Sequence, residues 1–417
     1  YNVIPRTVNV ILSIRQSQVV NLAFDHVVAL YPGSLPPPEH QFIMQDLRCM
    51  SVPFCLVNLP PRYFSAHARE VQIVMAQVID PGALAALVDV NRTGLSRLLS
   101  AYREVGRTDF VEEVLAQLKG LNIQLRLSDE QLFAAEDLFS LGSPGRSPLY
   151  SRIRALWSQH REAVLACRPD GVVTSMSPNE YLERVQAIRM ADAYHSLSIE
   201  RYRVTPELIS KIATEGWDPL NNEDGRKQVA AMAAKGYLEA FELVKKDAVE
   251  AYAARTSEPL KGSRLFAAQH QAWYQKLFAP SVDAGILERA DLVGYRRHMV
   301  FLRGSLHSPP HYDHVRDGME ALRECFDDEQ DAFVRAVLGH WLFGFIHPYM
   351  DGNGRMARFT MNLMLASGGF PWTVIRVEDR DRYMEALELA SVNDQIHPFA
   401  NFVAACVIRD AHPMASG

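Results

Sequence analysis

One short segment, His347–Arg358, constrains the fold of this chain more than any other feature, and it contains the letters HPYMDGNGRMAR. An apolar run at helical spacing, from Phe333 to Phe345, leads into the segment. Helical spacing resumes over Phe359–Leu365 and stops at a pair of glycines. Two further glycines flank an asparagine inside the segment and permit a tight turn. The pattern therefore predicts a helix, a glycine-rich loop and a second helix.

The loop has the residues needed to bind an anion. Glycines on both sides of Asn353 let backbone N–H groups turn inward where a helix begins, at the positive end of its dipole. Arg355 and Arg358 lie on one helical face and can bind phosphate oxygens. Asp351 is the carboxylate of the loop, and its natural partner there is Mg²⁺. His347 titrates near neutrality and can accept a proton from a hydroxyl. Together these residues predict attack on a phosphate group, whereas a bare Gly-Asn-Gly would indicate only a corner between helices.

Composition excludes several classes of protein. Of the 417 residues, 48% are hydrophobic and 22% charged, as in soluble globular proteins of two or three domains. The 43 basic and 49 acidic residues give a net charge of −6, which argues against nonspecific coating of nucleic acid or of an anionic membrane. No apolar stretch approaches the length of a membrane helix. The 5 cysteines form no CxxC pair, so we expect buried thiols and a cytoplasmic protein.

The first 145 residues predict a mixed α+β domain. The sequence becomes helical from Ala83 to about Leu138. The segment 142–148 combines Gly and Pro with small polar residues and predicts a linker. Before residue 80, runs of β-branched and aromatic residues predict three strands, Val8–Ile14, Val19–Phe24 and His26–Tyr31.

Nearly all of the chain after the linker is predicted to be helical. In the region 149–224, a capping box at Ser177–Glu180 opens a helix that runs to residue 200. A loop rich in Gly, Asn and Asp, residues 216–225, then separates this region from a domain at 225–410. That domain begins with a long helix through Val229, Met232, Tyr237 and Phe241.

The sequence of this loop resembles the Fic family signature H-P-F-x-[D/E]-G-N-G-R-x-x-R. It reads H-P-Y-x-D-G-N-G-R-x-x-R, with Tyr349 in the Phe position. The resemblance covers about 225–410 and includes a helix before the motif (340–346), a flap that docks the target (294–310) and a late helix (383–387). It implies a mainly α fold, with an all-helical core and a β-hairpin flap. It also implies transfer of AMP from ATP to a Ser, Thr or Tyr hydroxyl of a protein.

The resemblance assigns roles to individual residues. His347 would deprotonate the target hydroxyl, and Asp351 would hold Mg²⁺. The flap, about 299–310, would pair with the backbone of the protein target as an added strand. Self-modification and a homodimer are further partnerships that it leaves open. The nucleotide-binding residues would be Gly352, Asn353, Gly354, Arg355, Arg358 and Tyr383.

A second resemblance concerns regulation. The segment Ser196–Glu200 resembles the family's inhibitory motif, [S/T]-x-x-x-E-[G/N]. Glu200 would pair with Arg358 and occupy the space that the γ-phosphate of ATP needs, since a carboxylate binds an arginine strongly and directionally. Arg201 stands where the family has Gly or Asn, residues that permit a left-handed turn at a helix end.

Two alternatives remain. Residues 83–106 resemble a DNA-binding helix-turn-helix, with contacts from Arg92, Ser96, Arg97 and Arg103, so the chain could be a transcriptional regulator whose Fic core senses nucleotide. The complete set of loop residues favours an enzyme, because a protein that only senses nucleotide needs no general base. Removal of AMP by the same loop, with Glu200 orienting a water, is the other alternative. His340, inside the apolar run, is expected to be a core histidine.

Overall fold

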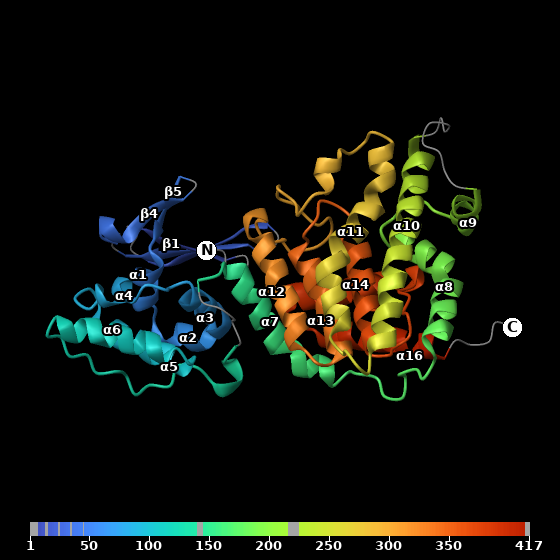
Figure 1. The fold of residues 1–417 in the computed structure, drawn as a ribbon. Helices are drawn as coiled ribbons and strands as arrows, with labels where there is room; N and C mark the ends of the chain where they lie inside the picture. Colours follow the sequence, from blue (N-terminus) through green and yellow to red (C-terminus); the bar gives the residue numbers. More distant parts are fainter. Residues whose placement is uncertain are drawn as a thin grey trace. The chain divides into compact units, whose positions relative to one another are not determined.

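The computed structural model describes residues 7–12, 16–23, 26–33, 36–44, 46–139, 145–215 and 225–412. The chain divides into two units, Tyr1–Ser158 and Gln159–Gly417, and both are dominated by helices, so the fold is mainly α as predicted (Figure 1). Residues 142–144 of the predicted linker and residues 216–224 of the predicted loop lie outside the described residues. No described helix is long and apolar enough to cross a membrane.

Two small sheets open the N-terminal unit. In the first, β3 lies between a parallel neighbour, β1, and an antiparallel one, β2. The second is a hairpin of β4 and β5, which the sequence analysis did not predict because these strands lack apolar alternation. Ile14 and Phe24, the predicted ends of two strands, lie outside the described residues. The strands are β1 Thr7–Leu12, β2 Gln18–Asn21, β3 Val27–Pro32, β4 Gln41–Met44 and β5 Leu47–Met50.

Six helices form the core of the N-terminal unit. These helices begin at Val52, well before the predicted start at Ala83. The sequence did not indicate the first two because each has only 6 residues, with proline in its first turn, and so shows no helical period. The predicted helical stretch ends early, at Gly120, and Leu132 and Phe133 of the following irregular segment are buried in the same core. The helices are α1 Val52–Val57, α2 Pro61–Ala66, α3 Ala68–Ala76, α4 Pro81–Ala85, α5 Arg92–Glu104 and α6 Thr108–Gly120.

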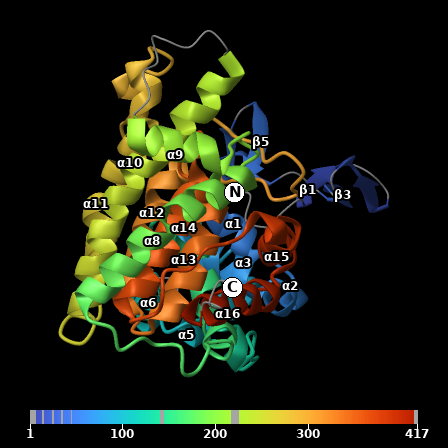
Figure 2. The ribbon, with the colours of Figure 1, turned by 90° about the vertical axis from the view of Figure 1, so that its right-hand side faces the viewer.

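The C-terminal unit is built around two buried helices, α13 Ala332–Ile346 and α14 Asn353–Ser367. Every residue of α13 except Gly344, and every residue of α14 except Gly354, is buried. Helices that are buried on all sides form the centre of a core, and here α10, α11, α12, α15 and α16 pack around them (Figure 2). The other helices are α7 Pro148–Leu165, which crosses the boundary between the units, α8 Pro178–Ile199, α9 Pro206–Glu215, α10 Gly225–Ala254, α11 Lys261–Asp283, α12 Val315–Asp328, α15 Arg380–Asn393 and α16 His397–Ala411.

The flap differs from the β-hairpin that was expected. Residues 293–311 contain no strand, only a turn at Arg303-Gly304. A two-stranded hairpin is marginally stable by itself, and Pro309 and Pro310 have no N–H to donate to a ladder. The flap is held instead by side chains of the surrounding elements, which leaves its backbone without a strand partner.

Glycine allows α10 and α11 to pack closely, and this gives a test of the packing. A Cβ added at Gly236 would lie 2.0 Å from the carbonyl oxygen of Leu277, whereas one at Gly344 would meet nothing within 4 Å. We therefore expect Gly236→Ala to lower the free energy of unfolding by about 2 kcal/mol, through overpacking against backbone. The matched control Gly344→Ala should raise it by about 0.5 kcal/mol through helix propensity. Chemical denaturation of both variants checks this, and equal effects would contradict the close approach.

Candidate active site

Two left-handed residues shape the loop between α13 and α14. His347 ends α13 with φ 53°, and Gly352 precedes α14 with φ 82°. The side chain of Asn353 then fixes the turn: its Oδ1 accepts from the Tyr349 N–H at 2.9 Å, and its Nδ2 donates to the Tyr349 carbonyl at 2.8 Å. The Asn353 side chain therefore holds the loop in shape, and its backbone N–H belongs to the first turn of α14.

The loop conformation sets the chemistry of His347. Its Nδ1 lies 3.4 Å from the carbonyl oxygen of Gly344, and donation to that oxygen leaves Nε2 as the nitrogen that can accept a proton. Burial is the main reason that the pKa of His347 falls to about 4. The imidazole is therefore neutral at pH 7, the protonation state that a general base requires.

Two buried arginines line the start of α14. The side chains of Arg355 and Arg358 are 1% and 5% exposed. Arg355 Nε and Arg358 Nη1 have no hydrogen-bond partner among the described residues. A Cβ added at Gly354 would lie 3.2 Å from Arg358 Nη1, so glycine leaves this space open beside the guanidinium. The combination of unpartnered guanidinium N–H groups, a helix N-terminus and an open glycine face suits an anion.

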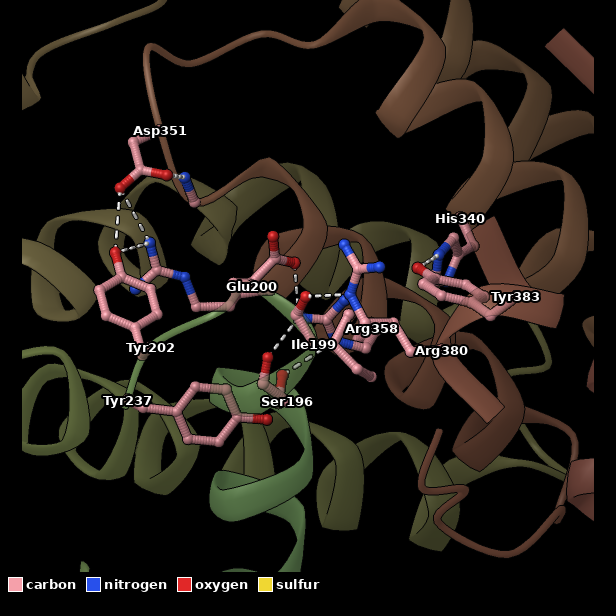
Figure 3. A network of polar contacts seen from close by, with 12 residues as sticks. Ser196, Ile199, Glu200, Tyr202, Tyr237, His340, Asp351, Arg358, Arg380 and Tyr383 are labelled. Atoms are coloured by element: carbon pink, nitrogen blue, oxygen red, sulfur yellow. Dashed lines mark hydrogen bonds and ion pairs between the residues drawn. The ribbon is translucent and has the colours of Figure 1, made fainter. Parts of the chain in front are cut away.

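The carboxylate of Glu200 lies in this space (Figure 3). Its Oε1 is 2.9 Å from Arg358 Nη2 and only 2.1 Å from the position of a Cβ on Gly354. Ser196 binds the same guanidinium through its Oγ, 2.8 Å from Nε, and through its carbonyl, 3.0 Å from Nη2. Burial is the largest single effect on the pKa of Arg358 and lowers it, but the electrostatic effects of Glu200, Tyr383 and Tyr237 and the hydrogen bond to Glu200 together raise it, so Arg358 stays charged beside Glu200.

Arg201 adopts the backbone conformation of the Gly or Asn that it replaces. Its φ is 65°, in the left-handed region, and its N–H donates to the carbonyl of Ser198 at 3.0 Å. The next N–H, of Tyr202, donates to Leu197 at 3.1 Å and closes the end of α8. Glu200 therefore faces Arg358 although the sequence departs from the family motif at the following position.

Asp351 is the residue of the loop suited to a metal ion. Its Oδ1 accepts from the Gly352 N–H at 2.6 Å, and the side chain is 63% exposed. No group of three or more His, Cys, Asp or Glu side chains in the described ranges could hold a metal. This fits Mg²⁺, which is commonly bound by one carboxylate and completes its shell with phosphate oxygens and water.

The structure places Tyr383 away from the loop surface. Tyr383 is 2% exposed, and a 2.7 Å hydrogen bond joins its hydroxyl to Nε2 of His340 (Figure 3). Burial raises the pKa of Tyr383 to about 12 and lowers that of His340 to about 3, so both are neutral core residues. Contact of Tyr383 with nucleotide stays a prediction, and His340 is the core histidine that was expected.

Arg296 ties the flap to the catalytic loop through backbone carbonyls alone. Its Nε donates to the carbonyl of His347 at 2.8 Å, and its Nη1 donates to that of His298 at 2.9 Å. Its Nη2 donates to the carbonyl of Pro310, so both ends of the flap meet at one guanidinium. Phe301, between these ends, is 82% exposed. Arg296 therefore fixes the base of the flap and leaves an apolar side chain at its surface.

Sequence reasoning missed several residues around the site. Arg380 of α15 donates to the carbonyl of Ile199 at 2.8 Å and holds the end of α8 (Figure 3). Phe278 of α11 packs against Gly352 and lies 5.1 Å from the Arg355 guanidinium. Both residues contact partners that are distant in the sequence. The apolar face of α11 could have suggested Phe278 as a buried residue, but no local pattern could have suggested Arg380.

The residues proposed for DNA contact are largely engaged within the N-terminal unit. Arg92 donates to the carbonyl of Gln124, and Ser96 Oγ donates to that of Arg126 at 2.7 Å. Arg97 donates to the carbonyl of Leu59 at 3.1 Å. These side chains hold neighbouring loops against α5, and contact of this helix with DNA stays an untested alternative.

Comparisons with known proteins concern mainly the C-terminal unit. Residues 264–365 match the model of the Fic/DOC family. A protein adenylyltransferase Fic from Nematostella vectensis is 39% identical over 119 residues, which are 28% of this chain and 27% of that protein. One from Drosophila willistoni is 34% identical over 116 residues, 27% of this chain and 23% of that protein. The match thus spans about a quarter of the length of these curated relatives.

Solved structures with Fic domains are also similar to this chain. Fic-1 from C. elegans, residues 134–508, is 15% identical with a TM-score of 0.44, over 86% of this chain and 89% of that one. A Fic-domain-containing signaling protein from Bacteroides thetaiotaomicron is 19% identical with a TM-score of 0.43, over 63% of this chain and 95% of that one.

The conformation of Arg201 gives a test of how α8 ends. Because a residue with a Cβ pays about 1 kcal/mol in the left-handed region, Arg201→Gly should raise the free energy of unfolding by about 0.5–1 kcal/mol. Arg201→Val should lower it by more than about 1 kcal/mol, because β-branched residues resist this conformation most. Thermal and chemical unfolding measure both variants. A stabilising valine would show that the left-handed turn is wrong.

Proposed function

We propose that the chain is a Mg²⁺-dependent protein adenylyltransferase that Glu200 autoinhibits, a proposal supported by the match of residues 264–365 to the Fic/DOC family model. The observation that carries the proposal is the Glu200 carboxylate beside Gly354 and Arg358, since this carboxylate marks an anion site next to a neutral histidine. ATP is the co-substrate, and a hydroxyl of a protein is the acceptor.

His347 acts as the base in the proposed reaction. Its Nε2 takes the proton of a Ser, Thr or Tyr hydroxyl while the hydroxyl oxygen forms a bond to the α-phosphorus of ATP. The bond from that phosphorus to the α–β bridging oxygen breaks, and pyrophosphate leaves. The N–H groups of Asn353 and Gly354, in the first turn of α14, would stabilise the charge that develops on the α-phosphate. Magnesium held by Asp351 would neutralise phosphate charge, as divalent cations do in phosphoryl transfer.

Arg358 carries the regulation in this proposal. Its guanidinium would bind the γ-phosphate and Arg355 the β-phosphate, so the carboxylate of Glu200 competes with ATP for Arg358. The competition is direct, because Glu200 already occupies the space beside Gly354. Bound ATP then lacks the contact that would orient its α-phosphate for in-line attack.

The flap is the proposed docking site for the protein target. Residues 299–310 have no strand partner among the described residues, and Phe301 at its centre is exposed. An extended segment of the target could add to this backbone as a strand, which would fix its hydroxyl near His347. The pairing to Arg296 at both ends holds the flap in place for that addition.

Removal of Glu200 tests the proposed function. In Glu200→Gly, Arg358 becomes free for the γ-phosphate, so labelling of protein from α-³²P-ATP should rise by about tenfold or more, the equivalent of one charge-assisted hydrogen bond. Glu183→Gly, an exposed position on the same helix, controls for loosening of α8. His347→Ala in the activated background should abolish labelling while ATP still binds.

The controls separate the alternatives. Label from γ-³²P-ATP in place of α-³²P-ATP would contradict adenylyl transfer. Loss of AMP from a preloaded protein, without labelling in Glu200→Gly, would favour the hydrolase alternative. Equal labelling of wild type and Glu200→Gly would leave an active enzyme that Glu200 does not restrain.

The low pKa of His347 predicts an unusual pH profile. A histidine is neutral, and competent as a base, at every pH above its pKa, so a lowered pKa extends this range toward acid. Because the pKa of His347 is about 4, kcat/KM of Glu200→Gly should stay flat from pH 8 to about pH 5.5 and fall only below that. A histidine at its ordinary pKa would halve kcat/KM near pH 6.5. Circular dichroism at each pH confirms folding, and a midpoint near 6.5 would contradict the burial effect.

A further inference from the structure

The lone pairs of Asp351 are largely occupied by other parts of the protein. Its Oδ1 accepts from the Gly352 N–H, and its Oδ2 lies 3.2 Å from Arg355 Nη2 and 3.2 Å from the hydroxyl of Tyr202. A carboxylate oxygen has two in-plane lone pairs, so both sites on Oδ2 are occupied. A cation that takes this oxygen as a ligand must displace one of the two donors.

Tyr202 reaches Asp351 from the segment that follows the inhibitory helix (Figure 3). Its hydroxyl accepts from Arg355 Nη2 at 3.3 Å, which leaves its proton to be donated to Asp351. Burial is the main reason that the pKa of this tyrosine is raised, so the hydroxyl keeps its proton at neutral pH. Tyr202, Asp351 and Arg355 thus form a closed ring of hydrogen bonds over the exposed carboxylate.

The ring of Tyr202 has a separate contact. The Arg355 guanidinium lies 5.1 Å from the centre of the Tyr202 ring and 5.1 Å from that of Phe278, so two aromatic rings hold it. The hydroxyl is bonded to both Asp351 and Arg355, whereas the ring contacts the Arg355 guanidinium, so Tyr202→Phe removes the hydroxyl's bond to Asp351 and keeps the ring contact.

We propose that Tyr202 is a second inhibitory residue, whose hydroxyl occupies the metal-binding oxygen of Asp351 while Glu200 occupies the site of the γ-phosphate. The inference rests on the proposed function and extends it from the phosphate to the divalent cation. Because Glu200 and Tyr202 belong to one short segment, closed by the backbone bond from Tyr202 to Leu197, displacement of that segment frees both ends of the triphosphate site.

Metal binding tests this inference without any transfer of AMP. The probe is Mn²⁺ alone, followed by the electron paramagnetic resonance signal of the free ion. In the full chain, Tyr202→Phe should bind Mn²⁺ about fivefold more tightly than wild type, since the ion no longer competes with a hydroxyl donor. Tyr202→Leu, which also lacks the hydroxyl, should shift in the same direction. Asp351→Asn should lose the site.

Tyr194→Phe is the matched control. This tyrosine lies on the same helix, and its hydroxyl has no hydrogen bond to residues 351–358 among those described. It should bind Mn²⁺ as wild type does. Unchanged affinity in Tyr202→Phe and Tyr202→Leu, with both variants folded by their thermal unfolding midpoints, would overturn the inference.

A second measurement connects Tyr202 to catalysis. In the Glu200→Gly background, Tyr202→Phe should lower the Mg²⁺ concentration for half-maximal labelling about fivefold and leave labelling at saturating Mg²⁺ within about twofold, because the phenyl ring still holds Arg355. An unchanged Mg²⁺ requirement would contradict the inference. Tighter Mn²⁺ binding without labelling in any variant would uphold the role of Tyr202 and refute the adenylyltransferase proposal, so the two failures are distinguishable.

Discussion

The ion pair of Glu200 and Arg358 is the interaction on which the arrangement of the site depends. A buried guanidinium is costly unless an anion and further acceptors compensate it, and removal of its partner leaves an uncompensated charge. In this chain Ser196 supplies neutral acceptors and Glu200 supplies the charge. The same demand for an anion explains why a carboxylate occupies the site. In the proposed function a phosphate would replace this carboxylate, so regulation and substrate binding would share one electrostatic requirement.

The rigid helices α13 and α14 make that competition possible. They are buried on all sides, so the loop between them is fixed at both ends, and the positions of His347 and Arg358 follow from the packing of the core. The segment with Glu200 is attached to this core by the bonds of Arg358 to Ser196 and Glu200, by Arg380 at Ile199 and by Tyr202 at Asp351.

The sequence was informative where structure is local. The helix–loop–helix around residues 347–358 and the capped start of α8 were predictable, because spacing and capping chemistry act over a few residues. The flap was not, because its expected ladder gives way to contacts with residues distant in sequence: Arg296 donates to the carbonyl of His347, 51 residues away, and the Leu306 N–H donates to Glu388, 82 residues away. Tyr202 was missed for the same reason: its importance comes from a contact 149 residues away. The short helices before residue 80 offered too few turns to show a period.

The three side-chain bonds of Arg296 have a consequence for how this site can change during evolution. All three acceptors are main-chain carbonyls, which every residue type presents equally. Substitution of His298 or Pro310 therefore leaves the acceptors in place, whereas substitution of Arg296 removes all three donors at once. Lysine could not replace it, because one ammonium cannot span the three directions of a guanidinium. The side chains of the flap can thus change without loss of these bonds, while the Arg296 guanidinium keeps the flap in register with His347.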